Sequence, residues 1–156
     1  MRIAAASVSK RAVWKLFVAG ACGSLAHTAL MAFKAWSGLL PSFQPYEALQ
    51  LALARLTGGA VPPLVPWVLS FLNGATAMSL IFGRLYPWLP GASGAAKGAA
   101  FGVIGWLAMG LVFFPLIGLG VFAADAGHAL WPAGFSLAML LAYSIVLGMV
   151  YAALGR

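Results

Sequence analysis

The sequence predicts an all-α membrane protein that crosses the bilayer with four helices. Two of the observations are compositional: residues of the AVILMFWYC set make up 63% of the 156 residues, and charged residues make up 7%. Soluble domains carry about 25% charged residues on average. The mean hydropathy of +1.00 points the same way. The third observation is four apolar runs of about 20 residues, the length needed to cross the hydrocarbon core.

The four predicted spans fill most of a single transmembrane domain, residues 1–156. They cover about residues 12–33, 64–82, 98–120 and 131–154. A basic start and small residues give the first span some likeness to a signal peptide. Its apolar run is longer than that of a signal peptide, so we expect an uncleaved first span. Pro115 is expected to kink or end the third helix.

A less apolar stretch joins the first two spans. Pro45 suits the first turn of a helix, and Gly58 with Gly59 supplies its end. Leucines recur between these marks at helical spacing, so we predict an amphipathic helix at residues 45–57. It is expected to lie on the outer membrane surface or over the mouth of the bundle.

The basic residues predict the orientation. One side of a four-span chain carries seven of the nine: Arg2, Lys10, Arg11, Lys15, Arg84, Lys97 and Arg156. Lys34, Arg55 and both acidic residues, Glu47 and Asp125, fall on the other side. Because cytoplasmic loops are rich in Lys and Arg, both termini are predicted to be cytoplasmic, in a bacterial inner membrane. The net charge of +7 is then explained by basic residues that set the orientation in the membrane and contact anionic lipids, and no nucleic-acid partner is expected.

The chain resembles itself in two halves. At an offset of 82 residues, Gly20 falls on Gly102 in the third span. At an offset of 65, Ser79 falls on Ser144 and Tyr86 on Tyr151, linking the second and fourth spans. This internal repeat predicts two duplicated helical hairpins related by a pseudo-twofold axis along the membrane normal.

Few residues are suited to chemistry. The chain has no H-E-x-x-H motif, no Walker loop and no paired carboxylates, and its two acidic residues lie in predicted outer loops. The chain therefore lacks suitable residues for general acid–base catalysis, and we predict neither an enzyme nor a cofactor. Cys22 is the only cysteine, so an internal disulfide is excluded.

His27 is the most notable polar residue, because an ionisable group inside a span usually faces the bundle interior. It is a candidate to bind a metal or relay a proton, or simply to hydrogen-bond a neighbouring helix. A metal set of His27, His128 and Asp125 has a suitable donor chemistry, although no spacing demands it. Asn73 and Tyr143 could join His27 in a polar intramembrane site, although an asparagine at mid-span more often ties two helices together.

One family resemblance rests on the run Phe114-Pro115-Leu116-Ile117-Gly118-Leu119 and on Gly127-His128. In these motifs, over roughly the last third, the chain resembles small uncharacterised bacterial inner-membrane proteins, including the YagU-like group. The resemblance implies no activity and no catalytic residues.

Three functional hypotheses follow. The first is a non-enzymatic accessory or assembly component, whose partners are the lipid bilayer and other membrane subunits or itself. The second is a small-solute or ion permease that acts as an oligomer, although the absence of acidic residues in the spans argues against a proton- or sodium-driven carrier. The third is a redox accessory that binds a metal or cofactor. A permease predicts a wet polar stripe between helices, whereas an accessory predicts a dry core.

Overall fold

The computed structural model describes residues 10–127 and 130–155. Every regular element in these two ranges is helical, and four helices are long and apolar enough to cross a membrane. They cover Val13–Ser37, Leu64–Leu85, Gly94–Leu116 and Trp131–Gly155. The predicted all-α fold with four transmembrane helices is therefore confirmed.

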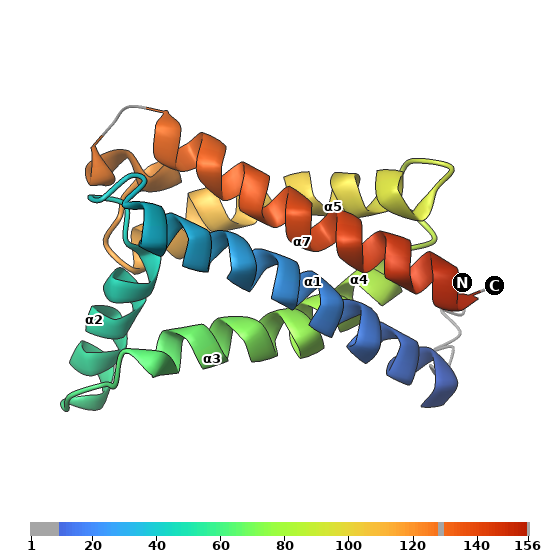
Figure 1. Ribbon diagram of the computed structural model, residues 1–156, viewed down its shortest axis with the longest axis horizontal. Coiled ribbons are helices and arrows are strands. Elements are labelled where there is room, and N and C mark those ends of the chain that lie inside the picture. The colour runs from blue at the N-terminus through green and yellow to red at the C-terminus, as the bar shows by residue number, and fades with distance from the viewer. Residues whose placement is uncertain (1–9, 128–129, 156) are drawn as a thin grey trace, which may run out of the picture.

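The first span belongs to α1 (Lys10–Ser37), which runs past the predicted end at residue 33. It stops where Gly38 adopts a φ of +67°, a left-handed conformation that glycine takes without strain. The short helix α2 (Pro45–Thr57) follows and ends in the same way at Gly58, whose N–H donates to the Ala54 carbonyl. α2 packs against the start of the second span and lies across one end of the bundle (Figure 1).

The second span is continuous but not uniform. It comprises α3 (Leu64–Asn73), one turn of π-helix, η1 (Gly74–Met78), and α4 (Ser79–Leu85). A π-helical turn inserts one residue into the α-helical pattern and weakens the local hydrogen-bond ladder. Side-chain donors that reach the middle of this span can therefore stabilise its backbone.

The third span contains a second π-helical turn. Its parts are α5 (Gly94–Ala108), η2 (Met109–Phe113) and α6 (Phe114–Leu116). Ser93 caps its start by accepting a hydrogen bond from the Ala96 N–H. The helix ends at Leu116, before the predicted boundary at residue 120, because positive φ angles at Gly118 (+83°) and Gly120 (+74°) break the helical backbone.

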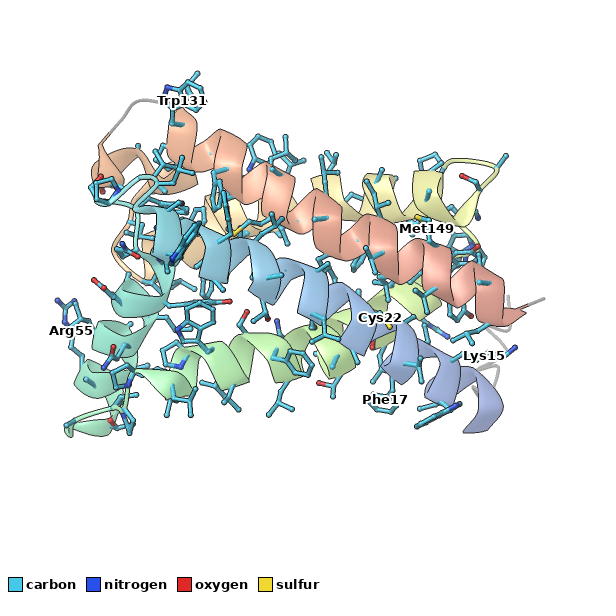
Figure 2. The ribbon with its side chains drawn as sticks, in the orientation of Figure 1. Lys15, Phe17, Cys22, Arg55, Trp131 and Met149 are labelled. Carbon is cyan, nitrogen blue, oxygen red and sulfur yellow. The ribbon has the colours of Figure 1, made fainter. Side chains whose placement is uncertain are left out.

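A 3₁₀ segment, η3 (Val121–Ala126), leads to the last helix, α7 (Trp131–Gly155). α1 and α7 lie side by side in the middle of the bundle, with the second span packed on α1 and α5 packed on α7. The start of α1, the end of α7 and the α4–α5 connection share one end of the molecule, opposite α2 and η3 (Figure 1). Lys15 and Arg55 mark these two ends (Figure 2).

Two apolar clusters form the core, one toward each end. The cluster toward the chain termini contains Leu16, Ala19, Phe82, Leu89, Phe101, Tyr143 and Leu147. The cluster beneath α2 and η3 contains Met31, Phe43, Phe114, Ala123, Ala126 and Met139. Each draws residues from at least three segments, so neither hairpin has a core of its own.

The two hairpins make matching contacts. A Cβ atom added to Gly20 would lie 2.7 Å from Ser79 Cβ and 2.8 Å from the Ala75 oxygen. A Cβ added to Gly102 would lie 3.2 Å from Ser144 Cβ and 3.2 Å from the Leu140 oxygen. These partners are related by the same offsets of 82 and 65 residues that the sequence suggests.

Further pairs follow these offsets. Gly83 faces the Leu16 side chain, and its equivalent Gly148 faces the Gly98 Cα. The equivalent residues Tyr86 and Tyr151 meet each other, with ring centroids 5.0 Å apart. If a twofold axis related the hairpins, equivalent residues could meet in this way only near that axis.

Candidate functional site

Three spans approach one another closely at mid-bundle. We call this region the crossing, and it is formed by Gly20, Gly23, Ser24, Gly74 and Tyr143. A Cβ atom on Gly23 would lie 2.7 Å from the backbone carbonyl oxygen of Tyr143, and one on Gly74 would overlap the Ser24 hydroxyl. Small residues allow helix backbones to approach this closely within a membrane.

Side chains at the crossing donate hydrogen bonds to backbone carbonyls in and beside the π-helical turn of the second span. The Tyr143 hydroxyl donates to the Gly74 carbonyl at 2.7 Å, and the Ser24 hydroxyl donates to the Phe71 carbonyl at 3.1 Å. Lipid offers no hydrogen bonds, so polar backbone groups at this depth depend on partners within the protein. The two hydroxyls thus connect α7 and α1 to the backbone of the second span.

The third and fourth spans have a corresponding connection. The Trp106 indole N–H points to the Ala133 carbonyl at 3.0 Å and to the Ser136 hydroxyl at 3.2 Å. Trp106 and Ser136 are the equivalents of Ser24 and Phe71 under the two offsets. This bond accounts for a tryptophan that lies well inside a span and away from its ends.

His27 lies on α1 one turn beyond Ser24, between the crossing and the buried Met31. Its side chain is partly exposed and makes no hydrogen bond with any residue in the described part of the chain. His27 therefore lies one helical turn from Gly23, which contacts Tyr143. No hydrogen bond joins His27 and Tyr143 in the described part of the chain.

Asn73, the third member of the predicted polar site, is exposed on the outer surface of the second span. Its chain neighbour Gly74 faces the crossing and is buried. The two residues thus face different directions, about 100° apart around the helix axis. Asn73 is not brought together with Tyr143, and it does not tie two helices of this chain together.

The predicted metal set of His27, His128 and Asp125 stays a prediction. Among the residues described, no group of three His, Cys, Asp or Glu side chains could hold a metal ion. His128 lies outside the described residues. Asp125 is exposed in η3, where its backbone N–H donates to the Leu119 carbonyl at 3.1 Å.

A polar cluster under α2 was not anticipated from the sequence. Lys34 is only 1% exposed, with its Nζ atom 3.3 Å from the Gln44 side-chain oxygen and 5.8 Å from the centre of the Phe43 ring. Hydropathy assigned Lys34 to the outer loop, but α1 continues to Ser37 and carries it under the connection. The signal available in the sequence was a basic residue in the last turn of a helix, where it also complements the helix dipole.

Tyr46 anchors α2 beside this cluster. Its hydroxyl donates to the Ser70 hydroxyl at 3.0 Å, and its ring meets Trp67 edge-on with centroids 4.6 Å apart. Burial raises the pKa of the Tyr46 phenol, and the hydrogen bond to Ser70 opposes this only in part. The phenol therefore remains a neutral donor at physiological pH, and α2 is fixed over the end of the bundle.

Comparison with known proteins gives one match. The model of a family of unknown function, DUF6789, matches residues 10–156. No curated protein and no solved structure matches the chain significantly. None of these comparisons supports the resemblance to the YagU-like group.

Proposed function

We propose that this chain, which belongs to the DUF6789 family of unknown function, has a non-enzymatic role in the bacterial inner membrane. In this role the protein is an accessory or assembly component that supports other membrane subunits or copies of itself. Four apolar spans establish a multi-pass membrane protein. The more specific role rests on how its polar groups are used.

The observation that carries the proposal is that the fully buried polar groups of the core already have hydrogen-bond partners. In the described residues, no fully buried side-chain nitrogen or oxygen lacks a hydrogen bond. The hydroxyls of Ser24, Ser79 and Tyr143 all donate to backbone carbonyls. A permeation path needs polar groups that are free to replace a solute's water shell. Groups committed to helix contacts favour a scaffold over a pore.

Water access at position 27 tests this proposal. In a Cys22→Ala background, we expect His27→Cys to resist a charged thiol reagent in membranes that are open on both faces. Trp88→Cys is the positive control, since Trp88 is 77% exposed in the α4–α5 connection. Met31→Cys, one turn from His27 and nearly buried, serves if His27→Cys does not fold. Rapid labelling at both interior positions would support an oligomeric permease instead.

Native mass spectrometry on protein extracted gently from its own membranes distinguishes the remaining alternatives. A stoichiometric second subunit supports the accessory role and names its process by association. A bound metal that is lost on His27→Ala would support the redox hypothesis. Neither outcome depends on knowing a substrate.

We also propose that both termini face the cytoplasm, which follows from the distribution of basic residues. Reporter fusions after residues 60 and 125 should report a periplasmic location, and a fusion after residue 90 a cytoplasmic one. α2 and η3 share one end of the bundle and the α4–α5 connection lies at the other, so the three fusions sample both ends. The reverse pattern of reporter activity would show that the orientation is inverted.

Duplication of an ancestral hairpin is a further part of the proposal. The matching contacts of Gly20 and Gly102, and the meeting of Tyr86 with Tyr151, support it beyond the sequence matches. The halves are not identical in packing. Gly23 presses on Tyr143, whereas its equivalent Gly105 has open space where a side chain would be. The first and fourth spans are therefore closely packed, without an equal contact between the third and second.

A further inference from the structure

Asn73 is a polar residue in an unusual position. Along the helix it lies about 13 Å from Leu64 and about 18 Å from Leu85, counting about 1.5 Å per residue, so it is near the middle of the span. It is exposed, and its side-chain amide has no hydrogen-bond partner in the described part of the chain. Thr76 on the same span bonds to its own helix at the Leu72 carbonyl, at 2.6 Å.

An exposed amide at this depth faces hydrocarbon in a single copy of the chain. Its two N–H donors and its carbonyl acceptor would be unsatisfied there, because the side chain is too short to reach either interface. Polar residues inside membranes are instead found in contact with other helices. The Asn73 surface is therefore expected to be covered by protein.

We propose that a second copy of this chain covers it, in a parallel dimer in which Asn73 of one copy bonds to Asn73 of the other. All copies cross the membrane in the same direction, so a twofold axis along the membrane normal places identical residues at identical depth. An amide is complementary to itself, because each copy can donate an N–H to the other's carbonyl. A partner of different sequence has no such guarantee of a matching group at this depth.

The surroundings of Asn73 suit such a contact. Leu69 and Leu72 precede it on the exposed surface at 44% and 51% exposure, and Leu80 follows at 40%. This pattern of one polar residue between apolar side chains resembles the interface of a coiled coil, where a buried asparagine sets register and oligomeric state. The equivalent position in the other half, Ala138, is also exposed but offers no hydrogen bond. The duplicated surface on α7 is thus a natural control.

Disulfide cross-linking in native membranes tests the geometry. In the Cys22→Ala background, Leu69→Cys and Leu80→Cys should give a covalent dimer on mild oxidation. The equivalent of Leu69 is Gly134, where an added Cβ meets nothing within 4 Å, so Gly134→Cys should fold and give no dimer. Equal dimer yields at Leu69→Cys and Gly134→Cys would overturn the proposal.

Energy transfer between labelled copies in lipid vesicles tests the role of the amide. Label is placed at Trp88→Cys, outside the membrane. Asn73→Leu removes one interhelical hydrogen-bonded pair, so the dissociation constant of its dimer should be about 3- to 30-fold higher than that of the unaltered chain. Asn73→Gln retains an amide and should recover most of the affinity, and Ala138→Leu should change nothing. The exposed position leaves folding intact, which thermal unfolding of each variant checks.

Self-association can fail independently of the proposed function. If Asn73→Leu dimerises as well as the unaltered chain, or if the unaltered chain stays monomeric, the Asn73 dimer is overturned. If Leu69→Cys instead cross-links to a different membrane protein, self-association is wrong while the accessory role gains support. If the dimer forms but position 27 is open to water, the accessory role fails and the dimer stands.

Discussion

Replacing Gly98 with alanine is expected to lower the free energy of unfolding by about 3 kcal/mol, the upper range for overpacking a tight contact. The added Cβ would overlap the Ser144 carbonyl oxygen and lie about 3.0 Å from Ile145 Cα. These are backbone atoms of α7 and cannot rotate away, so the two helices must separate. Unfolding in mixed micelles, followed by circular dichroism, measures the change.

Gly105 on the same helix provides the control. A Cβ there meets nothing within 4 Å, so Gly105→Ala is expected to be neutral or to stabilise by up to about 1 kcal/mol through helix propensity. Comparable losses in the two variants would mean that glycine acts through α5 flexibility and not through its contact with α7. A loss confined to Gly98→Ala assigns the effect to the contact.

The number and type of spans were predictable because a bilayer imposes a simple length and polarity rule. Pro45 and Gly58 act on the local backbone, so the ends of α2 were also accessible from the sequence. The end of the third span was predictable only in part. Pro115 was expected to kink or end this helix, which ends at Leu116. The boundary at residue 120 was wrong, since Ile117 and Leu119 continue the apolar run while Gly118 and Gly120 break the helix. Hydropathy measures side chains and is insensitive to this change in φ.

The rotation of each span about its own axis was the main unknown for the candidate site. Helices that are apolar all round offer no polarity contrast to indicate which side is buried. Asn73 was therefore grouped with His27 and Tyr143, whereas the structure exposes Asn73 and buries its neighbour Gly74. The π-helical turn after Asn73 also could not be predicted, because hydropathy does not detect one residue inserted into a helical turn.

Tyr143 could be identified from the sequence as a polar group in a span, but its role depends on that turn. Its hydroxyl is 2.7 Å from the Gly74 carbonyl, which belongs to the π-helical segment. We expect Tyr143→Phe to lower the free energy of unfolding by about 1–2 kcal/mol, because the ring still fits while the carbonyl loses its donor. Equilibrium unfolding in mixed micelles, with circular dichroism as the signal, is the measurement.

Tyr151→Phe is the matched control on the same helix. Its ring packs on Phe82 and Tyr86 with centroids 5.9 and 5.0 Å away, and its hydroxyl makes no hydrogen bond within the described residues. Removing that hydroxyl should change stability by less than about 0.5 kcal/mol. Equal effects of the two substitutions would indicate a general cost of losing a tyrosine hydroxyl. They would contradict a specific stabilising role for the hydrogen bond between Tyr143 and the Gly74 carbonyl.

The double variant Ser24→Ala/Tyr143→Phe shows whether the crossing acts as one unit. Ser24 and Tyr143 serve carbonyls three residues apart, at Phe71 and Gly74, on either side of the α3–η1 junction. Once one donor is lost, the junction is free to relax, so losing the second should cost less. We expect the double loss to fall short of the sum of the single losses by at least about 0.5 kcal/mol. Strict additivity would mean that the two bonds fasten α1 and α7 to the second span independently, and that the π-helical turn is held by packing against Gly20 instead.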